Sequence, residues 1–179
     1  PKLDVQFKNV HGKEDTLLTI QIDFALPERF GMTYIDKDNQ KKTPMVIHRS
    51  SMGCYERTIA LLIEKYAGHF PFWVAPTQIK LIPIKDMHIN YAKEVAARLK
   101  EAGLRFEIDD REERMQAKIR DAQLEKIPYM LIIGDNEVND KVITVRTKSG
   151  KNIKFSIEDF ISICQKQVQE KNIELIESV

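Results

Sequence analysis

The segment IHRSSMGCYER, residues 47–57, places basic side chains on both sides of a glycine, where an apolar strand gives way to an apolar helix. His48 and Arg49 lie in the strand, and Arg57 lies in the first turn of the helix. Positive charge at that position is unfavourable, because the helix dipole favours anions at its N-terminus. A bound anion such as a phosphate group would offset this cost, so the segment favours a phosphate-binding site.

The same residues also have simpler interpretations. A single histidine in a strand, such as His48, is ordinarily a hydrogen-bonded structural residue. Arg57 directly follows Glu56, and the two could form a solvated pair at the start of the helix. Cys54 is compatible with a small buried hydrophobic residue. These eleven residues alone therefore leave both a binding site and a structural role open.

The whole chain has the composition of a folded protein with reduced thiols. Of its 179 residues, 42% are hydrophobic and 31% are charged, which is enough to bury a core. The net charge of +1 argues against a generally basic surface, although a local patch could still bind RNA. Neither a long apolar run nor a signal-peptide pattern is present, so we expect a cytoplasmic protein without a membrane span. Cys54 and Cys164 form no CxxC motif, which suits reduced thiols.

The first part of the chain has the alternation of an antiparallel sheet. The expected strands cover residues 3–8, 17–24, 32–35 and 44–49, with a turn at 26–31, and a helix follows over about 55–67. Residues 68–78 contain two prolines and three aromatic residues, which interrupt both periodicities. We therefore expect a domain boundary there, between domains at 1–76 and 77–179.

The second part alternates strands with helices, which predicts parallel strands covered by helices. The expected strands cover residues 79–84, 105–109, 128–134, 141–147 and 153–155. The expected helices cover residues 90–103, 114–126 and 157–170, the last with Ser156 as its N-cap. The predicted fold class is therefore α/β.

Five segments, in the same order, resemble the C-terminal part of the threonyl-tRNA synthetase family. They are residues 1–4, 19–64, 70–84, 128–138 and 145–151. The resemblance implies an α+β portion of a class II catalytic domain with an antiparallel sheet and the motif 3 helix. It implies that an α/β anticodon-binding domain follows, with a mixed, mainly parallel sheet flanked by helices.

The resemblance implies part of a threonine–tRNA ligase, which activates threonine with ATP and Mg²⁺ and transfers it to threonine tRNA. Arg57 matches the motif 3 arginine that packs on the adenine, and Gln21 is implied to act with it at the catalytic site. The residues implied to line the ATP or adenylate pocket are Thr19, Gly53, Cys54 and Arg57. His48 matches the third protein ligand of the family's zinc ion, which binds threonine. The full-length family members are homodimers.

The other two zinc ligands and the motif 2 arginine precede this region in the family. We therefore expect the chain alone to bind zinc and ATP weakly or not at all, and not to aminoacylate. In the second domain, Glu137 and Arg146 match residues that read the anticodon, and Arg120 matches a further basic contact. From the residues alone, Arg146 and Glu137 could instead form a surface salt bridge between neighbouring strands.

The chain departs from the family pattern in two places. In GKEDTLLT, residues 12–19, Asp15, Leu17 and Leu18 are unusual, and Thr16 replaces a glutamine expected near the adenylate. Glu112 stands where an asparagine commonly touches the anticodon. Two hypotheses therefore stay open: a divergent threonine–tRNA ligase, or a non-catalytic paralogue that binds tRNA or other RNA or has a regulatory role. The presence of both His48 and Arg57 favours the ligase.

Overall fold

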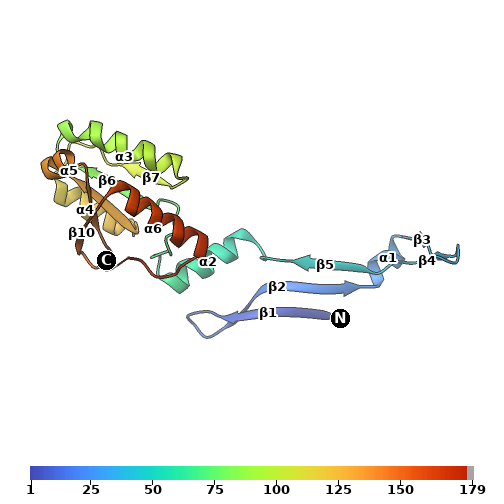
Figure 1. Ribbon diagram of the computed structural model, residues 1–179. Coiled ribbons are helices and arrows are strands. Elements are labelled where there is room, and N and C mark those ends of the chain that lie inside the picture. The colour runs from blue at the N-terminus through green and yellow to red at the C-terminus, as the bar shows by residue number, and fades with distance from the viewer. Residues whose placement is uncertain (177–179) are drawn as a thin grey trace. The chain divides into compact units, whose positions relative to one another are not determined.

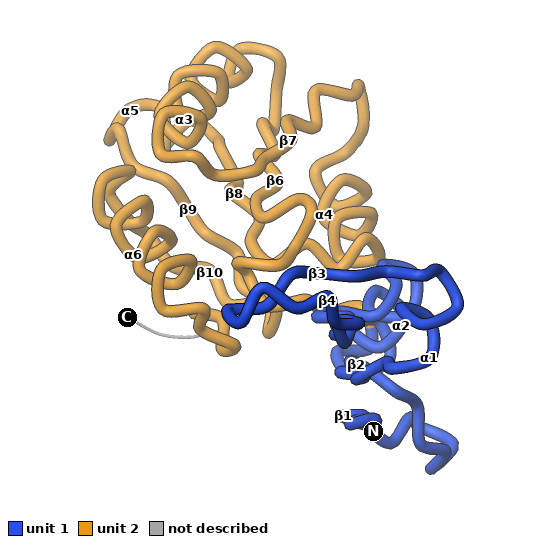
Figure 2. The backbone as a smooth tube through the Cα atoms, turned by 90° about the vertical axis from the view of Figure 1, so that its right-hand side faces the viewer, with its two compact units in different colours: residues 1–67 blue, residues 68–179 orange. Residues whose placement is uncertain are grey.

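The computed structural model describes residues 1–176 and divides the chain into two compact units, residues 1–67 and a second unit from Gly68 onward (Figures 1 and 2). None of the helices in the described part of the chain has the length and apolarity that a membrane span requires.

The first unit is built on a three-stranded antiparallel sheet with the strand order β1-β2-β5, as the alternating sequence predicted. The strands are β1 (Lys2–Lys8), β2 (Glu14–Asp23) and β5 (Val46–Ser50). Successive side chains of a strand point to opposite faces. Polar residues therefore collect on one face of β2, while Ile20 and Ile22 lie on the other.

Short elements connect and follow these strands. They are α1 (Ala25–Arg29), β3 (Tyr34–Ile35), β4 (Lys41–Lys42) and α2 (Tyr55–Tyr66). The segment expected as a turn at 26–31 contains most of the five-residue helix α1, because the Asp23 carboxylate accepts the N–H groups of Ala25 and Leu26 and starts a helical turn. Among residues 1–67, all of which are described, only Pro27 is buried.

The second unit contains a five-stranded sheet with the order β10-β9-β8-β6-β7. Its strands are β6 (Ile79–Pro83), β7 (Phe106–Ile108), β8 (Tyr129–Ile133), β9 (Ile143–Arg146) and β10 (Asn152–Phe155). β6 pairs in parallel with β7 and β8, whereas β9 is antiparallel to both of its neighbours. Four strands of this described sheet therefore run in one direction, which confirms a mixed, mainly parallel sheet.

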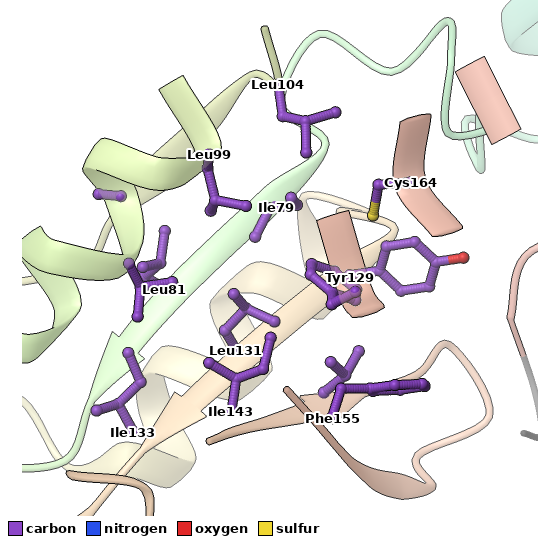
Figure 3. Packing of buried hydrophobic residues seen from close by; sticks show 14 of the residues in the cluster. Ile79, Leu81, Leu99, Leu104, Tyr129, Leu131, Ile133, Ile143, Phe155 and Cys164 are labelled. Atoms are coloured by element: carbon purple, nitrogen blue, oxygen red, sulfur yellow. The ribbon is translucent and has the colours of Figure 1, made fainter. Parts of the chain in front are cut away.

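Helices cover both faces of this sheet (Figure 1). They are η1 (Asp86–His88), α3 (Ile89–Glu101), α4 (Met115–Leu124), α5 (Asp135–Asp140) and α6 (Ile157–Glu170). The larger core packs α3 and α6 against the sheet, and Figure 3 shows Leu99 and Cys164 from these helices with Ile79 of β6 drawn between them. A smaller core lies under α4 on the opposite face. The Ser156 side chain accepts the Asp159 N–H, which confirms the predicted N-cap of α6.

The proline-rich segment before β6 is held by side chains of the second unit. The Arg105 guanidinium donates hydrogen bonds to the carbonyl oxygens of Trp73, Ala75 and Pro76. The buried Gln78 side chain donates to the Phe72 carbonyl and accepts the Arg105 backbone N–H. These bonds supply hydrogen-bond donors to backbone carbonyls that lie outside helices and strands.

Candidate functional site

Three of the predicted site residues share one face of the first unit's sheet. Gln21 lies directly opposite His48 in the β2–β5 pairing, and Thr19 lies opposite Ser50. Residues directly opposite each other in an antiparallel pair point to the same face, as do residues two apart on one strand. The register therefore places Thr19, Gln21 and His48 together.

Acidic side chains on the same face hold two of these residues. The Thr19 hydroxyl donates to Asp4 Oδ1 at 2.7 Å, and this hydrogen bond, with Lys2, holds the pKa of Asp4 below its usual value. His48 Nε2 lies 3.1 Å from Asp23 Oδ2. Gln21 is exposed. The face is therefore polar, with the Gln21 amide open to a ligand.

The other three residues predicted in this unit lie where β5 leads into α2. Gly53 has a φ of +67°, and a Cβ added there would lie 3.0 Å from the Leu17 carbonyl oxygen. Cys54 is the exposed N-cap residue of α2 and makes no side-chain capping bond. The Arg57 guanidinium donates to the Thr16 carbonyl at 3.1 Å. The start of α2 is thus fixed against the stretch of β2 where the sequence departs from the family pattern.

A zinc ion was implied for His48, and the residues of this chain do not form a complete site for one. Within the described residues, no group of three or more His, Cys, Asp or Glu side chains could hold a metal ion. A structural or catalytic zinc ion takes at least three protein ligands. His48 alone therefore cannot hold a zinc ion.

In the second unit, part of one sheet face is not covered by a helix. The core under α4 takes its sheet residues from β6 and β8. On β9, Thr144 and Arg146 point to that same side, because they lie opposite Ile132 and Met130 of β8. The facing residues of β10 are Asn152 and Lys154, which are exposed. β9 and β10 thus present an open polar face, defined by Thr144, Arg146, Asn152 and Lys154.

Glu137 adds a carboxylate to this open polar face. It lies on α5, directly after β8, and its Oε1 accepts the Thr144 hydroxyl at 2.7 Å. Its Oε2 accepts the Gly134 N–H at 2.9 Å. Burial alone would raise the pKa of Glu137, but the hydrogen bonds from Thr144 and Gly134 outweigh it and the pKa is lowered. The carboxylate is therefore ionised and fixed in orientation.

Arg146 supplies the positive charge of the same face. Its Nη1 donates to Asn152 Oδ1 at 3.2 Å, and its side chain passes over Gly150 of the following turn. Its Nε is buried and has no hydrogen-bond partner among the described residues. No ion pair joins Arg146 to Glu137 in the described part of the chain, so the surface salt bridge considered from the sequence is not formed.

The two remaining predicted residues lie apart from these contacts. Arg120 is exposed on α4 and bonds to the neighbouring Asp121. Glu112 is exposed in the loop after β7 and lines a cavity of about 310 Å³ together with Arg114 and the buried Lys118. No hydrogen bond in the described residues connects Arg120 or Glu112 to Glu137 or Arg146.

Sequence reasoning missed Thr144, which orients the Glu137 carboxylate. The signal was present, because strand alternation in KVITVRT puts residue 144 on the same face as Arg146. It also missed His88, a buried histidine in the turn after β6. Nothing in the local sequence distinguishes His88 from a surface histidine.

Comparison with known proteins matches both parts of the chain. Residues 78–167 match the family described as "Anticodon binding domain", and residues 1–66 match "tRNA synthetase class II core domain (G, H, P, S and T)". A threonine--tRNA ligase from Clostridium perfringens is 56% identical over 163 residues, which are 90% of this chain and 25% of the relative. One from Geobacillus kaustophilus is 46% identical over 177 residues, which are 98% of this chain and 27% of the relative.

A solved structure has the same fold. The crystal structure of the RNA binding domain of threonyl-tRNA synthetase from Cryptosporidium parvum superposes with a TM-score of 0.78 at 32% identity, over 93% of this chain and 42% of that chain. The chain spans about a quarter of the length of the curated relatives it matches. By these matches, the chain belongs to the threonyl-tRNA synthetase family, with part of a class II core domain followed by an anticodon-binding domain.

Proposed function

We propose that the second unit binds the anticodon loop of threonine tRNA on its open polar face, as part of a threonine–tRNA ligase. The observation that carries this proposal is that the Arg146 guanidinium lies on an uncovered sheet face and that the Glu137 carboxylate is bonded to Thr144 of the same face. An unpaired anticodon exposes the hydrogen-bonding edges of its bases, which such a face can contact.

The two charged groups suit different base edges. An arginine fork donates two hydrogen bonds to O6 and N7 of guanine, and threonine anticodons share a central guanine. A carboxylate accepts from a base N–H group. Arg146 exchanges its bond to Asn152 for the guanine. Glu137 is already ionised and fixed before the RNA arrives.

Arg120 and Glu112 take supporting roles in this proposal. Arg120, exposed on α4, contacts the RNA backbone, as a flexible cation at the rim of a binding face does. Glu112 repels phosphate, so the loop after β7 contacts a base edge or no RNA at all. The anticodon-binding domain is proposed to span 77–179, after a core-domain portion at 1–76.

The first unit contributes to the ATP and threonine sites of the full-length enzyme in this proposal. Arg57 packs on the adenine near the triphosphate, Gln21 acts with it at the catalytic site, and Thr19, Gly53 and Cys54 line the nucleotide pocket. His48, whose Nε2 lies beside Asp23, would supply one ligand of a zinc ion whose other ligands come from outside these residues. ATP, Mg²⁺, threonine, the homodimer and a cytoplasmic location belong to the full-length protein.

Binding of anticodon stem-loop RNAs to the 179-residue chain tests the proposal. We expect Arg146→Ala to cost about 1 to 3 kcal/mol in binding the threonine stem-loop and to lower discrimination against a changed central base. Lys154→Ala, on the same face, is the matched control and should weaken both stem-loops alike, as loss of a phosphate contact does. If Arg146→Ala also weakens both stem-loops equally, Arg146 does not read the base.

A further inference from the structure

The turn after β6 and the turn after β8 are tied together at the end of the sheet. The Ile84 N–H donates to the Ile133 carbonyl at 2.9 Å. A Cβ added at Gly134 would lie 2.9 Å from Ile84 Cδ1, so this glycine allows the two turns to touch. The third tie is polar, and it joins His88 to Asp135 at a distance of 3.0 Å.

His88 is 1% exposed, and both of its ring nitrogens are engaged. Nδ1 lies 3.2 Å from the Lys85 backbone N–H, which can only donate, so Nδ1 accepts. The neutral ring then carries its proton on Nε2, which donates to Asp135 Oδ1. A buried ring fixed at both ends is a rigid support for the carboxylate that it contacts.

Asp135 and Glu137 hold the short helix α5 from opposite sides. Residues two apart on a helix project about 200° apart, because each residue turns the helix by about 100°. Asp135 therefore reaches back to His88, while Glu137 reaches Thr144 on β9. A six-residue helix is not stable by itself, so its position depends on such anchors.

We propose that His88 is a positioning residue for base recognition: through Asp135 it fixes α5 so that the Glu137 carboxylate faces the open polar face. This inference rests on the proposed function of Glu137 in anticodon reading. It adds a buried residue that does not touch the RNA. Its loss displaces the carboxylate from the geometry that distinguishes one base from another.

Two near-isosteric substitutions separate the two hydrogen bonds of His88. His88→Gln places an amide donor near the position of Nε2 and keeps the bond to Asp135. His88→Asn places an amide oxygen near Nδ1, which keeps the Lys85 contact and loses the bond to Asp135. Asp135→Ala removes the acceptor from an exposed position, where unfolding of the unit is not at issue. Met87→Ala, at an exposed residue of the same turn, is the matched control.

The measured quantity is the ratio of affinities for the threonine anticodon stem-loop and a stem-loop with a changed central or neighbouring base. We expect His88→Asn and Asp135→Ala to reduce this ratio about threefold to tenfold, which is part of the discrimination that one base contact provides. His88→Gln and Met87→Ala should stay within about twofold of the wild type. The double variant His88→Asn/Asp135→Ala should reduce the affinity ratio no more than either single variant does.

Glu137→Gln separates failure of this inference from failure of the proposed function. If Glu137→Gln lowers the ratio but His88→Asn and Asp135→Ala leave it unchanged, the positioning role is wrong and the anticodon assignment stands. If His88→Gln reduces the affinity ratio as much as His88→Asn does, the hydrogen bond to Asp135 is not what maintains the ratio, and the inference is also wrong. If Glu137→Gln leaves the ratio unchanged, the reading role of Glu137 itself is wrong.

Discussion

Replacement of Arg105 by alanine should destabilise the second unit more than loss of an ordinary surface arginine. Two nitrogens of its guanidinium donate to three carbonyl oxygens of the proline-rich segment, at 2.9 to 3.2 Å. A hydrogen bond to a charged group contributes about 1.5 to 3 kcal/mol when desolvated. Because Arg105 is exposed, each bond contributes less than its desolvated value, and we expect Arg105→Ala to lower the free energy of unfolding by about 2 to 3 kcal/mol in total.

Trp73 makes the effect measurable, because it is the only tryptophan of the sequence and its carbonyl is one of the three acceptors. Urea unfolding followed by tryptophan fluorescence therefore reports on the segment that Arg105 holds. Arg98→Ala is the matched control: Arg98 makes one exposed ion pair with Glu158, worth less than about 1 kcal/mol. Arg105→Lys should recover less than half of the loss, since an ammonium group lacks the planar fork. Equal losses for Arg105→Ala and Arg98→Ala would refute the reasoning.

Three further predictions follow from other contacts. Gly53→Ala should lower the free energy of local opening in β2, measured by hydrogen exchange, by about 1 to 2 kcal/mol more than Gly12→Ala does. Both glycines have positive φ, but only Gly53 approaches a carbonyl oxygen. Hydrogen bonds from Arg111 hold the pKa of the buried Asp109 below its usual 3.8, so the ionised carboxylate stabilises the unit above about pH 4 and this contribution is lost as the pH falls through the folded pKa. The stability difference between the wild type and Arg111→Gln at pH 7 should therefore shrink in acid; a difference independent of pH would contradict this. Finally, native-state hydrogen exchange should show weaker protection in residues 1–67 than in the second unit, and equal protection would be incompatible with their difference in burial.

The sequence predicted the long elements well, because periodicity follows directly from which face is buried. Helix α6 begins and ends at the predicted residues, and β6 and β8 lie within the predicted strands. The short elements α1 and α5 were not predicted. Neither buries an apolar stripe long enough to show a helical period: α1 starts at the Asp23 carboxylate, and α5 depends on side-chain contacts with other segments.

The candidate site was predictable where the alternation of side chains along one strand places its residues. Arg146 and Thr144 share a face by alternation alone, and Glu137 was identified through the family resemblance. The support beneath Glu137 was not predictable, because His88 and Asp135 are 47 residues apart and meet only when β6 and β8 pair in parallel. A hydrogen bond of this kind leaves no pattern in the local sequence.

The two units hold their site residues in physically different ways, and this decides where each assignment can be tested. Glu137 and Arg146 rest on a sheet whose one face is buried under α3 and α6 and whose other face is partly covered by α4, so their geometry is a property of the isolated unit. Thr19, Gln21 and His48 are aligned by strand register and, for Thr19 and His48, by hydrogen bonds to Asp4 and Asp23, in a unit where Pro27 alone of residues 1–67 is buried. Register fixes the face to which a side chain points but not its rotamer. Substitutions at the open polar face are therefore informative in this chain, whereas those at His48 and Arg57 require the full-length protein.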